Sequence, residues 1–119
     1  LSNIHSYLKP SGLFVWSWDH SIFTDIVYED GKFVVVYSYH NEKPITIKDW
    51  KEKGCNAHIT YRKSATWFRL LREAGFEVEG YYEPEPVNMD RGFDDPTKYY
   101  SIQRARLLPS TFIFACKKK

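Results

Sequence analysis

Apolar residues recur at helical spacing at the start of the chain and then form an unbroken run. Leu1, Ile4 and Leu8 lie three or four positions apart, which predicts the end of an amphipathic helix. Residues 9–12 (Lys-Pro-Ser-Gly) stop that helix, because proline lacks an amide donor and glycine tolerates unusual dihedrals. Leu13–Trp16 follows without alternation and predicts a strand buried on both faces.

A β-hairpin is expected in the middle of the chain. Residues 21–28 fit either a short helix or an irregular segment, and the pattern does not choose between them. After a turn at Asp30-Gly31, residues 33–40 are rich in β-branched and aromatic side chains and predict a strand. Residues 45–47 alternate with polar neighbours, so we expect this strand to pair back on residues 33–40 through a turn at 41–44.

The hairpin insertion is expected to extend to residue 61 and to be followed by a helix. Residues 51–56 are polar and predict a loop, and residues 58–61 predict another short strand. Trp67–Ala74 has the clearest helical pattern, with Thr66 as its expected N-cap and Gly75 as its left-handed C-cap. The apolar stripe of this helix consists of Trp67, Leu70, Leu71 and Ala74.

Two further strands are expected in the C-terminal third. Phe76–Tyr81 alternates and predicts a strand with one solvated face, which Glu83–Pro86 ends as a rigid, extended exit. Residues 87–109 carry little pattern beyond a helical turn expected near 98–103. Thr111–Cys116 predicts a final buried strand. The 119 residues therefore predict one α/β domain over residues 1–119, with a β-hairpin insertion at residues 33–61.

Composition excludes several classes of protein. The net charge is only +2 and the basic residues are dispersed, so nucleic-acid binding is not indicated. The apolar runs are far too short for a membrane span, and no signal peptide is visible. Cys55 and Cys116 have no metal-ligand spacing, and His5, His40 and His58 are too scattered for a metal site. We therefore expect a cytoplasmic protein that binds neither membrane nor metal.

Three motifs in a fixed order carry a resemblance to a known family. Leu8–Val15 (LKPSGLFV) looks like a turn that leads into a buried strand, and His58–Phe76 (HITYRKSATWFRLLREAGF) is followed by Glu83–Pro86 (EPEP). Arg106–Pro109 (RLLP) precedes the last strand. Together these motifs resemble the C-terminal half of class I S-adenosylmethionine-dependent methyltransferases.

The resemblance implies a methyltransferase whose cofactor-binding half is not in this sequence. In the family, S-adenosylmethionine lies on a glycine-rich turn after the first strand, where the backbone can approach the ligand closely. The chain has six glycines and none in a G-x-G arrangement, so no cofactor-binding residue is expected in it. The fold implied is the C-terminal half of a Rossmann-like sheet with the inserted hairpin, and the 119-residue chain alone would be inactive.

The resemblance also indicates candidate residues on the acceptor side. His20 follows the end of a strand, where open α/β sheets place ligands, and is the candidate catalytic residue as a base or an acceptor-orienting group. Asp19, Tyr61 and Arg62 are candidate substrate-binding residues. The partner implied is a small-molecule methyl acceptor with a carbon, oxygen or nitrogen nucleophile. Glu83 and Glu85 are interpreted as parts of the rigid exit and not as a catalytic pair.

Two further expectations follow from the same sequence. The predicted strand at Leu13–Trp18 would lie in the middle of the intact sheet, so in this chain we expect an open strand edge and self-association. The alternative to an enzyme fragment is a self-contained α+β module without activity, whose aromatic surface binds a ligand or a protein partner. The high aromatic content, 18%, is compatible with both hypotheses.

Overall fold

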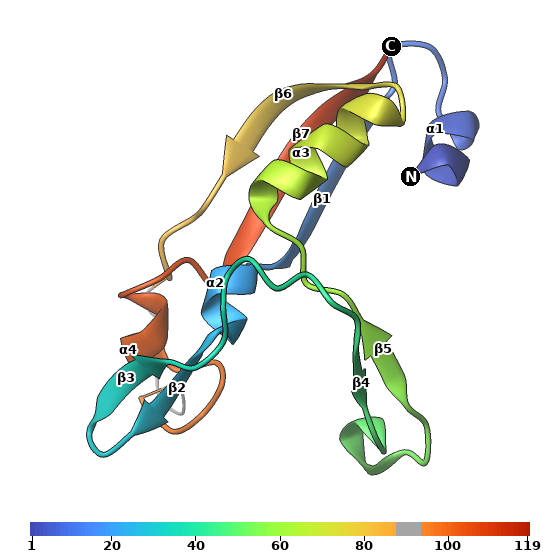
Figure 1. The fold of residues 1–119 in the computed structure, drawn as a ribbon. Helices are drawn as coiled ribbons and strands as arrows, with labels where there is room; N and C mark the ends of the chain where they lie inside the picture. The colour runs from blue at the N-terminus through green and yellow to red at the C-terminus, as the bar shows by residue number, and fades with distance from the viewer. Residues whose placement is uncertain (88–93) are drawn as a thin grey trace.

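The computed structural model describes residues 1–87 and 94–119, and it forms a three-stranded sheet with two smaller hairpins (Figure 1). The sheet has the order β1–β7–β6, where β1 is Leu13–Asp19, β6 is Phe76–Tyr82 and β7 is Thr111–Lys118. β7 is antiparallel to both neighbours, so β1 and β6 run parallel to each other across it. The fold is thus mixed α/β with antiparallel strand pairs, and the three predicted sheet strands are confirmed.

One face of this sheet carries the core, and helix α3 (Ser64–Glu73) covers it (Figure 1). The buried core residues are Leu71, Phe76, Phe112, Phe114 and Cys116. The short helix α1 (Ser2–Tyr7) packs at the end of the same face, where the His5 ring lies edge-on to Phe76 at a centroid distance of 5.2 Å. Large apolar side chains at alternate strand positions therefore produce a single apolar layer beneath α3.

The prediction that Leu13–Trp16 is buried on both faces is wrong. Leu13 and Val15 are 67% and 63% exposed, whereas Phe14 and Trp16 point toward the core and are partly buried. The reason is that α3 and α1 lie on one face of the sheet, and in the described part of the chain no helix covers the other. β7 is likewise buried at alternate positions and not on both faces.

Two separate hairpins replace the predicted one. β2 (Ile26–Glu29) pairs with β3 (Lys32–Val35), and β4 (Ile45–Ile47) pairs with β5 (Ala57–Ile59). The predicted pairing of residues 33–40 with 45–47 is wrong, because positive φ angles of 48° at Asp30 and 79° at Gly31 turn the chain back at once. The undecided segment 21–28 is part helix, α2 (Ser21–Thr24), and part strand β2.

The remaining boundaries differ in smaller ways. Helix α3 starts at Ser64, so Thr66 lies in its first turn and donates to Glu42 Oε1 at 3.0 Å instead of capping the helix. Gly75, with φ of 90°, ends the helix as predicted. The 3-10 turn η1 (Trp50–Glu52) interrupts the predicted loop. Helix α4 (Ile102–Ala105) lies slightly beyond the predicted turn, and residues 88–93 of the weakly patterned segment 87–109 lie outside the described residues.

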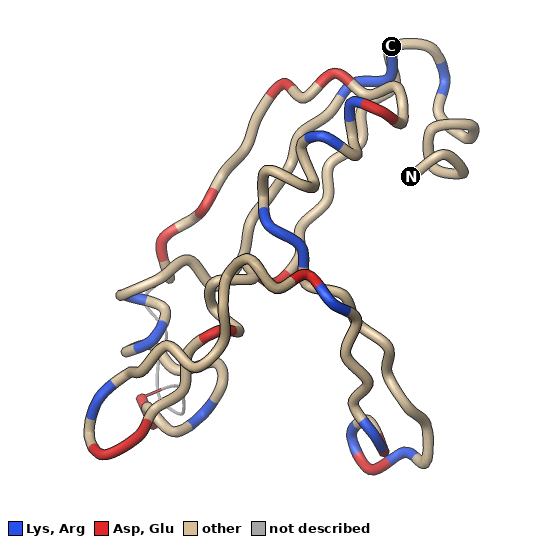
Figure 2. Tube along the Cα trace, viewed as in Figure 1, with Lys and Arg blue, Asp and Glu red and all other residues tan. Residues whose placement is uncertain are grey.

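Along residues 1–87 and 94–119, the Lys and Arg residues do not gather on a single surface. Lys and Arg are dispersed over the helices, hairpins and strand ends (Figure 2). None of the helices in the described ranges has the length and apolar character needed to cross a bilayer. Cys55 is exposed and Cys116 is buried, and both are free thiols.

Candidate functional site

His20 is held at the junction between β1 and α2. Its backbone N–H donates to the Ser110 carbonyl at 3.0 Å, and its extended backbone makes it the N-cap of α2. The ring Nδ1 accepts from the Ile22 N–H at 3.2 Å. The residue is only 4% exposed. A helix begins here because a side-chain acceptor satisfies one of its free amide donors, which also fixes the imidazole.

The other ring nitrogen of His20 faces Glu83, which follows the end of β6. The distance from Nε2 to Glu83 Oε1 is 2.8 Å. Because Nδ1 accepts a hydrogen bond from the backbone, the consistent tautomer of the neutral ring carries its proton on Nε2 and donates it to the carboxylate. In this arrangement both nitrogens are engaged within the chain, which favours an orienting role for His20 over that of a free base.

Tyr81 and Ser64 complete the group that we call the His20 cluster (His20, Ser64, Tyr81 and Glu83). The Tyr81 hydroxyl donates to Glu83 Oε1 at 2.6 Å and lies 2.5 Å from Ser64 Oγ. Since the phenolic proton goes to Glu83, Ser64 donates to Tyr81. The cluster joins the end of β1 to the end of β6 and, through Tyr81, to the first turn of α3, so β1 is held to a part of the chain more than forty positions away.

The cluster keeps its carboxylate charged and its phenol protonated. The Tyr81 hydrogen bond, opposed by burial and supported by His20, lowers the pKa of Glu83. Burial and the neighbouring Glu83 raise the pKa of Tyr81 well above the usual value for a phenol. At neutral pH, Glu83 Oε1 is therefore an anionic acceptor that receives hydrogen bonds from two donors, His20 and Tyr81.

Glu83→Gln is expected to lower the free energy of unfolding by about 1 kcal/mol at pH 7. A hydrogen bond to a charged group contributes about 1.5–3 kcal/mol, and solvent screening reduces this because the Glu83 side chain is 41% exposed. Urea denaturation of both proteins measures the difference. Glu85→Gln is the matched control, because Glu85 is exposed and makes no hydrogen bond within the described residues, and it should change stability by less than about 0.5 kcal/mol.

The Glu83 contribution should depend on pH with a defined sign. A carboxyl whose pKa is lowered by folding stabilises the protein above its unfolded pKa of about 4.3. That contribution disappears as the pH falls through the lowered pKa of folded Glu83. The stabilities of the parent and Glu83→Gln should therefore differ at neutral pH and converge in acid, and a difference that persists unchanged in acid would contradict the ionic origin.

A cavity of about 350 Å³ lies at the end of β1, the strand that His20 follows, and its walls are formed by residues other than those of the His20 cluster. Its walls include Trp18 and Asp19 from β1, Trp50 from η1, and Tyr61 and Tyr100 from the segments after β5 and before α4. We call it the aromatic cavity. Four large aromatic side chains and one carboxylate meet there from three separate stretches of the chain, at residues 18–19, 50–61 and 100.

Asp19 is the acidic group of the aromatic cavity. Both of its carboxylate oxygens accept from the Tyr100 hydroxyl, each at 3.2 Å. Burial raises the pKa of Asp19 and the Tyr100 hydrogen bond opposes that shift. Burial, reinforced by Asp19, raises the pKa of Tyr100 to about 12 and also raises the pKa of Tyr61. The phenols therefore remain uncharged at neutral pH beside the carboxylate.

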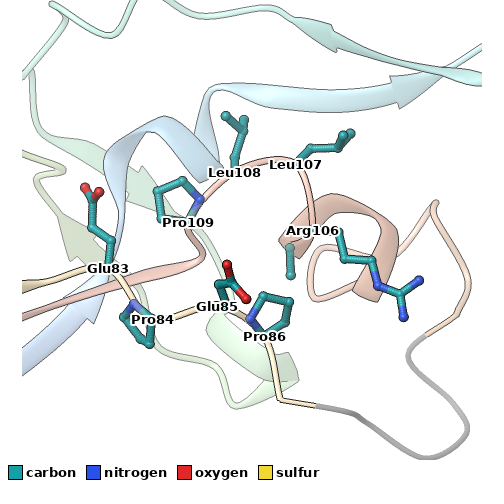
Figure 3. A pocket seen from close by; sticks show the side chains of 9 residues that line it. Glu83, Pro84, Glu85, Pro86, Arg106, Leu107, Leu108 and Pro109 are labelled. Atoms are coloured by element: carbon teal, nitrogen blue, oxygen red, sulfur yellow. The ribbon is translucent and has the colours of Figure 1, made fainter.

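A second cavity, of about 410 Å³, lies between the Glu83–Pro86 exit and residues 105–109 (Figure 3). Three prolines, Pro84, Pro86 and Pro109, form much of its wall. Proline restricts its own φ and the conformation of the preceding residue, so the exit from β6 is stiff. This stiffness supports the position of Glu83 beside His20.

The structure divides the four predicted site residues between different surroundings. Asp19 and Tyr61 line the aromatic cavity, whereas His20 points into the buried cluster. The Arg62 guanidinium lies over the Trp67 ring at 5.1 Å and does not line the aromatic cavity. Their roles in catalysis and substrate binding stay predictions.

Sequence reasoning missed several residues that the fold brings together. These are Ser64, Tyr81 and Glu83 in the His20 cluster, and Tyr100 in the aromatic cavity. Glu83 had a usable signal, because a carboxylate at a strand end before proline is held rigidly. No local sequence pattern indicated the contacts of Trp50 and Tyr100, because these contacts depend on how the hairpin and the segment before α4 return to β1.

Two crystal structures share this fold over nearly the whole chain. One, from Listeria monocytogenes and named as an S-adenosylmethionine-dependent methyltransferase, matches 99% of this chain with a TM-score of 0.71 and 24% identity. Another, an S-adenosylmethionine-dependent methyltransferase from Mesorhizobium loti, matches 98% with a TM-score of 0.64 and 23% identity. This chain spans 52% of the length of each. No protein-family model and no curated protein matches the sequence.

The described residues do not fit S-adenosylmethionine as a bound cofactor. The turn from β1 into α2 contains Asp19, His20 and Ser21 and no glycine. Gly12 precedes a strand, Gly80 lies within β6, and the positive-φ glycines 31, 54 and 75 lie in turns that lead into a strand or a loop. No glycine-rich turn from a strand into a helix therefore occurs among residues 1–87 and 94–119.

Proposed function

We propose that the chain is the C-terminal, acceptor-side part of an S-adenosylmethionine-dependent methyltransferase. The observation that carries the proposal is the match of 99% of this chain to about half of a methyltransferase structure at a TM-score of 0.71. In this proposal, β1, β7 and β6 with α3 are the C-terminal half of a Rossmann-like sheet. Residues 33–61 belong to an insertion. This insertion and the preceding strand β2 together form two hairpins, β2–β3 and β4–β5.

The shape of the chain supports the hypothesis that it is part of a larger domain, and it is less compatible with a self-contained module. Its radius of gyration is 16.6 Å and its longest dimension is 51 Å. A compact domain of this length has a radius of gyration of about 13–14 Å. The two hairpins extend away from the sheet (Figure 1), and the sheet face that bears Leu13 and Val15 is exposed. A covering half would account for both features.

The acceptor side of the proposed enzyme is the end of β1, where His20, Asp19 and the aromatic cavity lie. Open α/β sheets bind ligands beyond the carboxyl ends of their strands. A cavity of about 350 Å³ is in the range of small-molecule sites. The cofactor would be held by the half of the enzyme that supplies the glycine-rich turn, and the chain's own residues would bind and orient the acceptor.

The isolated chain is expected to bind S-adenosylmethionine negligibly, whereas the intact protein should bind it stoichiometrically. The reason is the lack of a glycine-rich strand-to-helix turn in the described residues. Isothermal calorimetry on the chain and on the product of the whole reading frame measures both. Micromolar binding to the isolated chain, or an upstream coding sequence without an apolar strand and glycine-rich turn, would overturn the proposal.

A self-contained binding module remains the second candidate function, favoured by the aromatic cavity. Its walls bring together residues of β1, η1 and β5 with Tyr61, Tyr100 and Thr111. If the module hypothesis holds, the protein made from the whole reading frame should neither bind S-adenosylmethionine nor transfer a methyl group. Its aromatic cavity should still bind a ligand. The calorimetric comparison therefore decides between the two functions.

We also expect the isolated chain to self-associate along β1. β1 is an edge strand, and its exposed face carries Leu13 and Val15, whereas the other edge strand, β6, presents Glu77 and Glu79. An apolar open edge pairs readily with a second copy, and charged residues protect an edge. In sedimentation velocity the parent chain should form dimers or larger species at high concentration.

Val15→Lys should shift the chain toward monomer, because it places a charge on the open edge. Val35→Lys is the matched control, since Val35 is 71% exposed but lies in β3, away from the sheet. The control should leave association unchanged. A parent chain that sediments as a monomer at high concentration would contradict the prediction.

A further inference from the structure

The aromatic cavity contains a carboxylate with no cationic partner. The groups that affect the Asp19 carboxylate are its own burial and the Tyr100 hydroxyl, and no Lys, Arg or His of the described residues forms an ion pair with it. A partly buried charge without a counter-ion is costly. The cavity is therefore electrostatically complementary to a ligand that brings a positive charge.

The walls around Asp19 have the chemistry that binds such a charge. Trp18, Trp50, Tyr61 and Tyr100 line the cavity, and tryptophan and tyrosine rings attract cations to their faces. The chain itself shows this attraction at Trp50, where the Lys51 ammonium lies 5.5 Å from the ring centre. Lys51 does not line the cavity, so it leaves room for a ligand there.

The neighbouring buried arginine does not supply the missing charge. The Arg104 guanidinium lies over the rings of Phe23, Phe33 and Tyr99 at 5.3–5.9 Å, and Arg104 is not among the cavity residues. An anionic ligand would be repelled by Asp19. A neutral aromatic ligand could use the rings but would leave the Asp19 charge without a counter-ion.

We propose that the aromatic cavity binds a small cationic amine, with Asp19 as its counter-ion and the four rings as its walls. That this amine is the acceptor substrate rests on the proposed function; its ammonium, which has no free electron pair, would anchor the substrate at Asp19 and would not itself accept the methyl group. The cation site itself does not depend on methyl transfer.

The test compares a charged probe with a neutral probe of the same shape. Choline carries a trimethylammonium group, and 3,3-dimethylbutan-1-ol replaces that nitrogen with carbon. Choline should bind the 119-residue chain at least about tenfold more tightly, a ratio equal to about 1.4 kcal/mol. Proton–nitrogen NMR of the four indole N–H groups reports binding and its place in one titration.

The four tryptophans provide an internal control. The Trp18 and Trp50 indole resonances should shift with choline, because both rings line the cavity. The Trp16 and Trp67 indole nitrogens are buried, and neither residue lines the cavity, so their resonances should stay in place. Unchanged Trp16 and Trp67 resonances in a variant also show that its core is still folded.

Asp19→Asn removes the charge and keeps an oxygen that can accept from Tyr100. It should weaken choline binding at least about tenfold and abolish the preference over the neutral probe. Asp30→Asn is the matched control, because Asp30 is exposed in the β2–β3 turn, and it should leave both affinities unchanged. Trp50→Leu tests the aromatic wall. It should weaken the binding of choline more than the binding of the neutral probe.

Each outcome is decisive for the cation site. Equal affinities of the two probes, or a folded chain whose Trp18 and Trp50 resonances do not respond to choline, would overturn it. If choline binding fails while the intact protein binds S-adenosylmethionine, only this inference is wrong and the proposed function stands. If choline binds while the intact protein binds no S-adenosylmethionine, the cation site stands and the methyltransferase proposal fails.

Discussion

Phe114→Ala is expected to remove about 3–5 kcal/mol from the free energy of unfolding, the range measured for buried aromatic side chains. Phe114 is 1% exposed and lies in the central strand β7. Its ring centre is 4.8 Å from that of Tyr81 and 5.5 Å from that of Phe112, and it stacks on Trp16 at 6.1 Å. The surrounding rings come from three strands and cannot close around the space left by the truncation.

Such a loss is large for this chain. Domains of this size are stable by only about 5–15 kcal/mol, so the variant should be partly unfolded at room temperature or melt at a much lower urea concentration. The truncation should also loosen the His20 cluster, because the Tyr81 ring that packs on Phe114 carries the hydroxyl that binds Glu83.

Urea denaturation followed by tryptophan fluorescence measures the effect. Phe68→Ala is the matched control, because Phe68 is 43% exposed on α3 and alanine favours helix. It should cost less than about 1 kcal/mol. If both truncations cost the same, Phe114 is not in the core that the structure describes.

The regular elements of this fold were predictable because their residues alternate or recur with the period of the element. The strands at β1, β6 and β7 and the helix that ends at Gly75 were all placed correctly, within a few residues, from local patterns. The face that each strand buries was not predictable for β1. An apolar run such as Leu13–Trp16 specifies two buried faces only if both are covered, and the helices of the described chain cover one.

The error in the hairpins has a local physical cause. The Asp30-Gly31 pair adopts positive φ at both positions, which matches the two-residue turn of a tight hairpin. Residues 26–29 therefore become the partner of residues 32–35, and residues 45–47 pair with 57–59. The turn was recognised in the sequence, and the strand before it was not, because a helix occupies the first half of residues 21–28.

The candidate site was predictable only in part. His20 and Asp19 could be selected because they follow a predicted strand end, where sheets place ligands, and Tyr61 because its segment resembles one on the acceptor side of the methyltransferase family. Glu83 was interpreted as a structural exit, and its hydrogen bond with His20 spans 63 positions of the sequence. Contacts of this kind depend on the order of the strands, since β7 enters between β1 and β6 and brings their ends within reach of one another.

In the intact enzyme of the proposed function, His20→Ala is expected to lower turnover by on the order of a hundredfold, the usual cost of losing a group that moves or positions a proton. The geometry gives the physical reason. His20 fixes the Glu83 carboxylate through Nε2 and begins α2 through Nδ1, beside the residues that line the aromatic cavity. Without the ring, both the carboxylate and the start of α2 lose the contact that holds them.

The stability of the variant should fall much less than its activity. The hydrogen bond from the Ile22 N–H contributes about 0.5–1.5 kcal/mol, and the bond to the Glu83 carboxylate contributes about 1 kcal/mol after solvent screening, so the enzyme should remain folded in the assay. Turnover and urea denaturation are measured on the same preparation. His58→Ala is the matched control, because His58 is an exposed histidine with one side-chain hydrogen bond, to Thr46, and it should keep normal turnover.

A conservative variant separates the two roles considered for His20. His20→Gln keeps an N–H that can donate to Glu83 and lacks a basic nitrogen. If His20 orients Glu83 and the acceptor, the His20→Gln variant should recover at least about a tenth of the lost turnover, at an unchanged KM for the acceptor. If His20 is the base, His20→Gln should be as inactive as His20→Ala, because an amide accepts no proton at neutral pH. Normal turnover of His20→Ala in a folded enzyme would return the residue to a purely structural role as the N-cap of α2.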